Sequence, residues 1–296
     1  MKRLLIILVA GLFAITVSAQ TFVYQNDTAV LSLSGFDYGE LVWQSSPDSV
    51  NWLDIPGATL NPYKLVPATS KYYRAKITQG QCNPYYSIPT YIEVRIFACG
   101  DILEDYRDVQ TYPTVQIGTQ CWMAKNLNVG QMIINGSAAQ ADNQIIEKYC
   151  NSNDSNKCAT HGGLYTWDEM MQYSTTESVQ GICPVGWHVP SDPEWIQLEV
   201  ALGMDAAVAA QINIWRGTDQ GTQMLAGGSS GYNGLLSGSA IPGGAFSAFN
   251  QYEYMYSSTV YGGNAWRRCL RVGDPQVGRW NTFPRSYALS VRCVKN

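Results

Sequence analysis

The chain has 296 residues, of which 46% are hydrophobic and 14% are charged, so it is long enough for two domains and too apolar for a disordered protein. Its 19 basic and 23 acidic residues give a net charge of −4 without any basic run, which argues against nucleic acid or an anionic membrane as partner. The 27 Gly, 13 Pro, 19 Tyr and 9 Trp residues favour a turn-rich β protein over a helical bundle.

Residues 1–19 have the pattern of an export signal. Lys2 and Arg3 precede an apolar run, residues 4–17, that is short for a bilayer span. Small residues at 17–19 supply a cleavage pattern, so we expect a cut after Ala19. A less favoured alternative is an uncleaved membrane anchor. We expect a secreted or cell-surface protein with no membrane insertion after signal cleavage.

Residues 20–97 are predicted to form a β-sandwich, because short alternating segments are separated by Gly, Pro and Ser turns. A W-Q-x-S-x-D-x-x-x-W-x-x-I-x-G-A-T pattern starts at Trp43 and is followed by a Y-Y-R strand at 72–74. By this pattern the stretch resembles bacterial immunoglobulin-like modules. The resemblance implies an all-β immunoglobulin-like spacer or presentation domain, with Trp43 in its core.

Residues 98–104 are predicted to be a linker, and residues 105–296 a second domain of the α+β class. This domain opens with a hairpin over 111–127, and a polar, Asn-rich segment follows. Two helix starts come before a Gly/Ser-rich stretch that we expect to be a loop. Strands are predicted to return at 254–259, 265–272 and 287–294.

Both helix starts carry a capping box, in which a hydroxyl and a carboxylate satisfy each other's free backbone amides. The first pairs Thr166 with Glu169, and the second pairs Ser191 with Glu194. Gly203 is predicted to end the second helix.

All eight cysteines lie between residues 82 and 293, and an even number in an exported chain favours disulfides. No C-x-x-C pair is present, so the sequence does not support a zinc ribbon or thioredoxin-like chemistry. Spacing alone does not choose among the many possible pairings.

Four sequence blocks carry a family resemblance: VQIGTQCWMAKNL at 115–127, GGLYTW at 162–167, CPVGWHVPSDPEW at 183–195 and SVRCV at 290–294. By these blocks residues 99–296 resemble the Fibrobacter succinogenes major paralogous domain, a family of exported bacterial proteins that is similar to C-type-lectin-like domains. Residues 254–259 depart from the family's aromatic-Trp-Ser-Ser pattern, which affects the expected packing there but not the fold. The resemblance implies an α+β C-type-lectin-like fold whose termini meet in one sheet.

The resemblance also implies a disulfide between the first helix and the last strand. Together with a local pair in the polar loop and a pair that pins the opening hairpin, the expected disulfides are Cys183–Cys293, Cys150–Cys158 and Cys99–Cys121. Cys82 and Cys269 are left over, and the sequence does not decide whether they are free or joined to each other.

Our leading hypothesis is a non-catalytic binding or adhesion protein without a cofactor, whose partner is an extracellular glycan or protein. Residues 252–287 are rich in Tyr, Trp, Arg and Asn, which suit recognition surfaces, and some lectin-fold proteins present a diversified surface from this region. The predicted ligand contacts are Tyr261, Asn264, Arg268, Trp280, Asn281, Phe283, Arg285 and Tyr287. Trp266 and Tyr256 are expected in the core. Gly278 and Pro284 indicate that the segment from 278 to 284 is a loop.

Two other functions remain open. A structural subunit of a surface layer or fibre suits the two-domain layout equally well. An enzyme like the formylglycine-generating group is not expected, because that copper chemistry needs two close reactive cysteines, whereas Cys293 is expected in a disulfide. His161 and His188 are predicted to be structural. The calcium-binding triplets of lectins are absent from the sequence, so no metal site is predicted.

Overall fold

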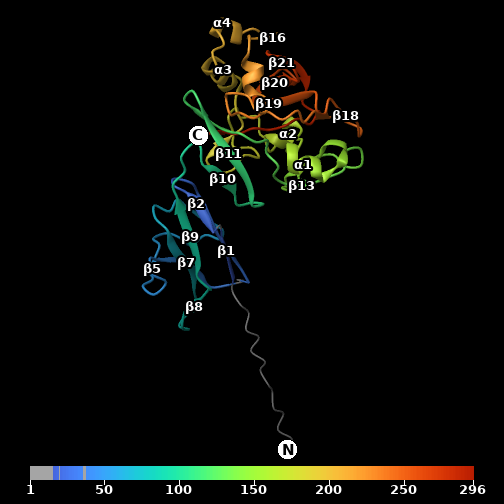
Figure 1. Ribbon diagram of the computed structural model, residues 1–296. Helices are drawn as coiled ribbons and strands as arrows, with labels where there is room; N and C mark the ends of the chain where they lie inside the picture. Colours follow the sequence, from blue (N-terminus) through green and yellow to red (C-terminus); the bar gives the residue numbers. More distant parts are fainter. Residues whose placement is uncertain (1–15, 20, 36–37) are drawn as a thin grey trace, which may run out of the picture. The chain divides into compact units, whose positions relative to one another are not determined.

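The computed structural model describes residues 16–19, 21–35 and 38–296. The chain divides into two compact units, Met1–Phe97 and Ala98–Asn296 (Figure 1). Strands dominate and the helices are short, so the β-rich character predicted from composition is confirmed.

The predicted export signal lies mostly outside the described residues, because 1–15 are not among them. Its last part, Thr16–Ala19, forms strand β1, which pairs with β3 (Ala29–Ser34) in antiparallel fashion. Cleavage after Ala19 would therefore remove an edge strand from this unit.

Unit 1 contains two sheets around one core. The first has the order β1-β3-β6, with β6 at Tyr63–Leu65. The second has the order β2-β9-β7-β4-β5, with β8 beside β7; these strands are Phe22–Tyr24, Thr90–Arg95, Lys71–Thr78, Glu40–Ser46, Leu53–Asp54 and Tyr85–Tyr86. Buried and partly exposed residues alternate along β3 and β7, as expected for strands with one face on a core.

Trp43 occupies the centre of this core, as predicted. It is fully buried among residues such as Leu31, Ala75 and Ile92. Its indole Nε1 donates a hydrogen bond to the carbonyl of Leu60 at 2.9 Å. Burial of the ring therefore leaves no polar atom unsatisfied.

The first sheet of unit 2 joins the start of the unit to its end. Its order is β10-β11-β12-β22-β15, and these strands are Ile102–Asp105, Gln110–Ile117, Gln120–Met123, Val294–Lys295 and Trp187–His188. Trp122 of the opening hairpin lies opposite Val294. The predicted linker at 98–104 is wrong in part: Leu103 in β10 is 1% exposed and pairs with Tyr112. A strand of this length gives little signal in a sequence.

The second sheet of unit 2 has the order β16-β21-β20-β19, and these strands are Ile214–Arg216, Val277–Pro284, Asn264–Arg271 and Tyr252–Tyr261. Two smaller pairs are β13–β14 and β17–β18, at Gln131–Met132, Glu147–Lys148, Ser239–Ala240 and Phe246–Ser247. The predicted strand at 287–294 is regular only at its end. Before Val294, residues such as Leu289 and Ser290 make isolated bridges.

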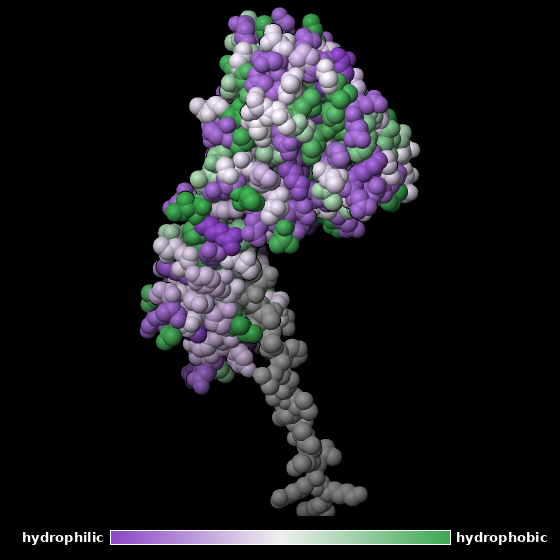
Figure 2. Space-filling model, viewed as in Figure 1, coloured by the Kyte–Doolittle hydropathy of each residue, from purple (hydrophilic) through white to green (hydrophobic). Residues whose placement is uncertain are grey.

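The helical segments of unit 2 are η1 Asn151–Asn153, α1 Ser155–His161, α2 Trp167–Met170, α3 Asp192–Ala201, α4 Ala206–Ala209 and α5 Gln220–Met224. No helix in the described ranges has the length and apolarity needed to cross a membrane. Hydrophilic and hydrophobic residues are interspersed over the face seen in Figure 2.

The capping box predicted before α3 is present. The amide of Ser191 donates to the carboxylate of Glu194 at 2.7 Å, and the helix ends at Ala201, shortly before Gly203. Trp195 of this helix packs on Trp122 of β12 with ring centroids 4.7 Å apart. The helix thereby attaches to the first sheet.

The capping box predicted before α2 is only half formed. The Thr166 hydroxyl accepts a bond from the amide of Glu169 at 3.4 Å. The Glu169 carboxylate accepts instead from the amide of Glu147 and the hydroxyl of Tyr173, both at 2.9 Å. The buried carboxylate is thus bonded to one distant group, the amide of Glu147, and to one nearby group, the hydroxyl of Tyr173, and not to the amide of Thr166.

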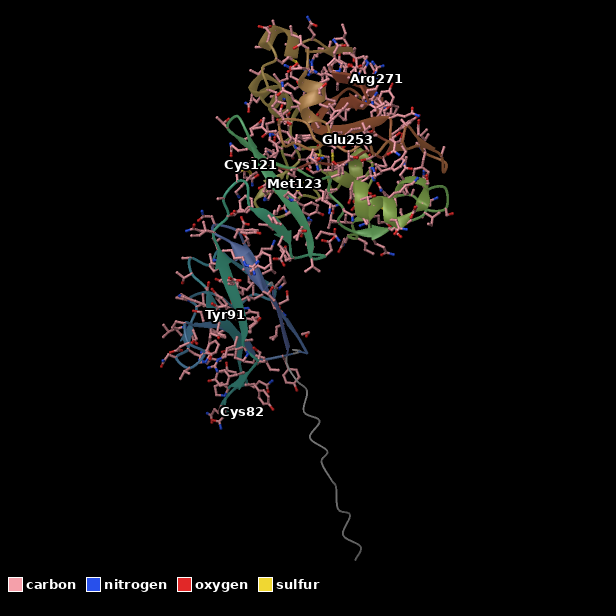
Figure 3. The ribbon with its side chains drawn as sticks, in the orientation of Figure 1. Cys82, Tyr91, Cys121, Met123, Glu253 and Arg271 are labelled. Carbon is pink, nitrogen blue, oxygen red and sulfur yellow. A yellow bond between two sulfur atoms is a disulfide. The ribbon has the colours of Figure 1, made fainter. Side chains whose placement is uncertain are left out.

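Three disulfides stabilise unit 2, and they are the expected pairs Cys99–Cys121, Cys150–Cys158 and Cys183–Cys293. The position of Cys183 differs from the expectation, because it lies in the turn between α2 and β15 and not in a helix. Cys82 and Cys269 are free, the former exposed in unit 1 (Figure 3) and the latter buried in unit 2.

A carboxyl group is buried inside unit 2. Glu253 of β19 has no exposed surface and lies in the interior in Figure 3. Burial raises the pKa of Glu253 to about 7, although the nearby charge of Arg292 and bonds from Asn126 and Ser237 oppose the rise. Between about pH 4.5 and 7, the folded protein therefore keeps a proton on Glu253 that the unfolded chain has released.

The variant Glu253→Gln should show this difference. A carboxyl pKa raised by folding gives a stability contribution that is complete below the unfolded pKa and is lost as the pH rises through the folded pKa. The free energy of unfolding of the wild type, relative to the variant, should thus fall by ~3 kcal/mol between about pH 4.5 and 7. Urea unfolding of both proteins across this range measures it. Parallel pH profiles would contradict the assignment.

Candidate functional site

One face of the second sheet of unit 2 carries a group of aromatic side chains. Successive residues of a strand point to opposite faces. In β19, Tyr252 and Tyr254 are partly exposed, whereas Glu253, which lies between them, and Met255, which follows them, are buried. We call the partly exposed side the aromatic face. It comprises Trp215, Tyr252, Tyr254, Arg267, Arg271, Trp280, Phe283 and Tyr287.

The rings of the aromatic face form a continuous row. Tyr252 and Tyr254 are stacked at 5.3 Å between centroids, with 7° between planes, and Tyr254 and Phe283 are stacked at 6.4 Å. Tyr287 follows at 4.5 Å from Phe283. At the other end, Trp215 lies 6.4 Å from both Tyr252 and Trp280. These separations are in the range that aromatic pairs prefer, so the rings support one another.

Two arginines lie among these rings. The guanidinium of Arg267 is 3.9 Å from the ring centroid of Phe283 and 4.8 Å from that of Tyr254. The guanidinium of Arg271 is 4.9 Å from the ring of Trp215 and forms an ion pair with Asp274. Such cation–π contacts hold the planar cations in place.

Arg267 differs from Arg271 in having no acidic partner. Its Nε and one of its Nη atoms are buried without a hydrogen-bond partner, and no carboxylate in the described part of the chain pairs with it. Burial raises the pKa of the neighbouring Tyr254 to about 12, so this phenol is neutral at physiological pH. The row of rings therefore holds a positive charge that is not neutralised locally.

Two small residues, Gly278 and Cys269, lie in the strands that carry the row of rings. Gly278 of β21 lies opposite Cys269 of β20. A Cβ at Gly278 would come within 2.5 Å of the Trp280 indole nitrogen and 3.1 Å of the Cys269 Cβ. Glycine here marks a close approach inside a strand. Burial also raises the pKa of the Cys269 thiol to about 11, which keeps it protonated at neutral pH.

Three of the predicted ligand contacts belong to the aromatic face, namely Trp280, Phe283 and Tyr287. Tyr261 is 58% exposed at the end of β19, where its ring contacts Trp266. Asn264 is partly exposed at the start of β20. Arg285 forms an ion pair with Asp168 and lies over the ring of Trp167 at 4.0 Å. As expected, Trp266 and Tyr256 are buried.

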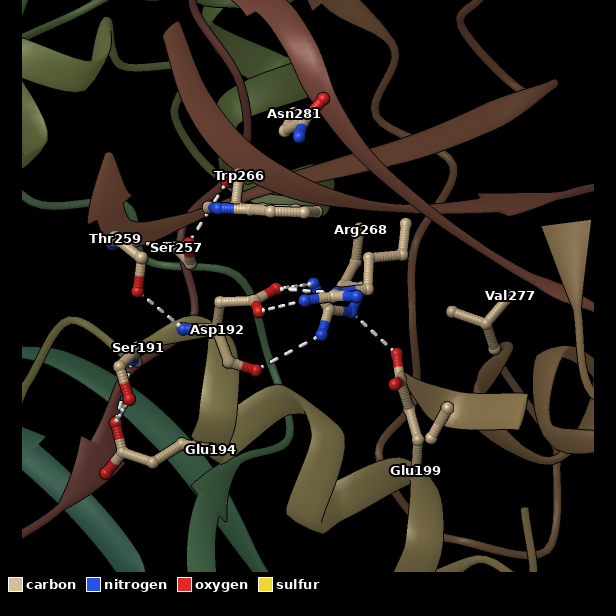
Figure 4. A network of polar contacts seen from close by, with 12 residues as sticks. Ser191, Asp192, Glu194, Glu199, Ser257, Thr259, Trp266, Arg268, Val277 and Asn281 are labelled. Atoms are coloured by element: carbon tan, nitrogen blue, oxygen red, sulfur yellow. Dashed lines mark hydrogen bonds and ion pairs between the residues drawn. The ribbon is translucent and has the colours of Figure 1, made fainter. Parts of the chain in front are cut away.

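Two of the predicted contacts are wrong, because Arg268 and Asn281 are buried on the other side of the sheet. Arg268 has no exposed surface. It donates to Asp192 at 2.5 Å and to Glu199 at 2.6 Å, both on α3 (Figure 4). Arg279 also binds Asp192, at 2.6 Å, and Arg216 binds Glu199 at 2.5 Å.

This buried network attaches α3 to the sheet. Burial alone would raise the pKa of Asp192, but bonds from Arg279 and the charge of Arg268 hold it below its ordinary value. The carboxylate is therefore ionised, and its charge is matched inside the protein. Arg268 has a structural role as a consequence.

Tyr252, Tyr254 and Arg271 lie in the segment 252–287 that the sequence marks as rich in recognition-type residues, but they were not among the predicted ligand contacts. Trp215 and Arg267 were missed. Residues 252 and 254 are two apart and residues 267 and 271 are four apart, and such even spacings in a strand could have indicated a shared face. Trp215 comes from β16 and reaches the row only through the pairing of β16 with β21. No local signal in the sequence marks it.

The described residues contain no group of three or more His, Cys, Asp or Glu side chains that could hold a metal ion. The aromatic face itself consists of rings and two arginines.

In comparisons with known proteins, one family model matches within each unit. The sequence model of the Fibrobacter succinogenes major domain matches residues 115–295. A second model, described as Domain of unknown function (DUF8696), matches residues 13–96. No curated protein and no solved structure matches the chain. The first match covers more than half of the sequence and includes the whole aromatic face, and the chain therefore belongs to the Fibrobacter succinogenes major domain family.

Proposed function

We propose that this is an exported, non-catalytic recognition or adhesion protein that binds a polysaccharide carrying acidic groups through the aromatic face. In this proposal unit 2 is a C-type-lectin-like domain, and unit 1 is an immunoglobulin-like spacer that presents it outside the cell. The three disulfides support an oxidising environment, where such bonds form and persist.

The observation that carries the proposal is a row of partly exposed rings around an arginine without an acidic partner. Contiguous aromatic surface of this kind marks interaction sites on soluble proteins. Flat rings in a row suit the apolar faces of successive sugar rings. The guanidinium of Arg267 is held by ring contacts, and its positive charge attracts a carboxylate or sulfate. Because its Nε and one Nη are buried, the other Nη is the atom that would donate a hydrogen bond to such a group.

The fold assignments have separate support. Two sheets around one tryptophan-centred core favour an immunoglobulin-like unit 1. In unit 2, the opening hairpin and the C-terminal strand lie in one sheet, and Cys293 is bonded to Cys183. Both features agree with what the C-type-lectin-like resemblance implies.

A glycan array tests the proposed function. The double variant Arg267→Ala, Trp280→Ala should bind acidic glycans about tenfold or more weakly than the wild type, because it removes the unpaired cation and one end of the row. Its melting temperature should stay close to that of the wild type, because both side chains are partly exposed. The exposed Tyr85→Ala in unit 1 is the matched control and should bind normally.

The array should include neutral, carboxylated and sulfated glycans, and a peptide array should be run beside it. Binding that weakens with salt and prefers acidic glycans supports the proposal. Equal binding by the wild type and the double variant would contradict it, and so would selective binding to peptides. Self-association on a sizing column without any ligand would favour a surface-layer or fibre subunit instead.

A further inference from the structure

Unit 2 also contains a cavity that none of the aromatic-face residues lines. Its volume is about 470 Å³, within the range of small-molecule sites. It lies between residues 135–140, the start of α2, residues 240–243 and residues 285–286. Because its lining is separate, a ligand here would not compete for the rings of the aromatic face.

The walls of this cavity are fixed by side chains that bind backbone groups. The Asn135 amide nitrogen donates to the carbonyl of Ile241 at 3.1 Å. Gln140 donates to the carbonyl of Leu164 at 3.0 Å and accepts from the amide of Thr166 at 2.7 Å. Both amide side chains thus join the loop 135–140 to other parts of the wall. A site held in this way loses little entropy when it binds a ligand.

One oppositely charged pair lies on the wall. Asp168 and Arg285 form an ion pair, and their side chains are 43% and 26% exposed. The guanidinium of Arg285 rests on the ring of Trp167, and its Nε is buried without a hydrogen-bond partner. The pair is therefore fixed in place but retains unused hydrogen-bonding capacity, and its net charge is zero.

Tyr173 completes the lining in a strained conformation. It has a φ of 59°, and the preceding Gln172 has a φ of 49°, in the left-handed region that side chains other than glycine disfavour. Its hydroxyl donates to Glu169 at 2.9 Å. Strain of this kind is concentrated at functional sites. Here it places an aromatic ring on the cavity wall.

We propose that the cavity binds a neutral sugar, with two adjacent hydroxyl groups bridging Asp168 and Arg285. Each sugar hydroxyl is both a donor and an acceptor, so one pair of hydroxyls can donate to the carboxylate and accept from the guanidinium without separating them. A free amino acid would have to break the ion pair to satisfy its own two charges. Tyr173 and Pro242 supply apolar contact for the ring carbons.

Saturation-transfer NMR on the full chain tests this site. The probes are glucose, galactose, mannose and N-acetylglucosamine, each at millimolar concentration, with glycine and alanine as the amino-acid arm. At least one sugar should receive saturation from the wild type. Asp168→Ala should weaken its binding about tenfold, and Ala139→Trp, which fills the cavity from its exposed rim, should abolish it.

The double variant of the aromatic face should keep the sugar signal, which separates this site from the proposed function. The inference is overturned if no sugar receives saturation, if the signal survives Ala139→Trp, or if only the amino acids bind. A melting temperature for each variant shows that the loss of signal is not due to unfolding.

Discussion

Replacing both Cys183 and Cys293 with serine is expected to lower the free energy of unfolding by about 4–5 kcal/mol. The bond joins residues 110 positions apart, and it connects the turn before β15 to the C-terminal strand. In the chain-entropy description, a disulfide restricts the unfolded chain more strongly when the loop it closes is longer. Without the bond, the C-terminal segment is still held by the pairing of β22 with its neighbours and by hydrogen bonds such as that from the amide of Leu127 to the carbonyl of Val291.

Urea unfolding of the oxidised protein measures this loss. The matched control replaces Cys150 and Cys158, which are eight positions apart and should cost only about 2–3 kcal/mol. Loss of the long-range pair should lower the free energy of unfolding more than loss of the local pair. Equal losses, or the reverse order, would show that the long disulfide does not stabilise unit 2 by closing it.

The second large effect is expected at the buried ion pairs. Arg268→Ala should destabilise the protein by about 3–5 kcal/mol, because it leaves Asp192 and Glu199 in the interior with one partner fewer each. The remaining partners, Arg279 and Arg216, neutralise the two carboxylates only in part.

Arg271→Ala is the control on the same strand. The side chain of Arg271, labelled in Figure 3, is 43% exposed, and that of its partner Asp274 is 8% exposed. Because water reaches the arginine, this single pair should contribute about 1 kcal/mol, so the variant should lose much less stability than Arg268→Ala. A loss at Arg268 no larger than that at Arg271 would refute a structural role for the network.

The sequence predicted those features that local chemistry determines. The start of α3 follows from a serine and a glutamate three residues apart, and the burial of Trp43 follows from its place in an alternating strand. The family blocks led to the correct disulfide partners. In each case the residues that specify the feature are close in the sequence or belong to a known pattern.

The face of the second sheet was harder to predict. Arg267 and Arg268 are adjacent and chemically identical, yet one lies among the exposed rings and the other in the buried network. A shift of one residue in register moves a side chain to the opposite face. Bulges between Tyr256 and Val260, and between Ala265 and Arg267, disturb the alternation of buried and exposed residues. Without that alternation, the sequence does not show which of the two arginines lies on the aromatic face.

Strand β21 was missed for a different reason. Gly278 and Pro284 suggested a loop, but Pro284 ends the strand and Gly278 is required by the nearby Trp280 and Cys269. Only the tertiary contacts show that this glycine allows close approach and does not form a turn. The half-formed capping box at Thr166 also depends on tertiary contacts, since the Thr166 amide donates to Gln140 and the Glu169 carboxylate accepts from the amide of Glu147.

The central claim is that the aromatic face is where this protein meets its ligand. Hydroxyl-radical footprinting of the protein, with and without the acidic polysaccharide selected on the array, measures this directly. We expect ligand-dependent protection of Trp215, Tyr254, Trp280 and Phe283, and unchanged labelling of Tyr85 and Tyr91 in unit 1. Protection confined to unit 1, or unchanged labelling of all four face residues in the bound protein, would contradict the claim.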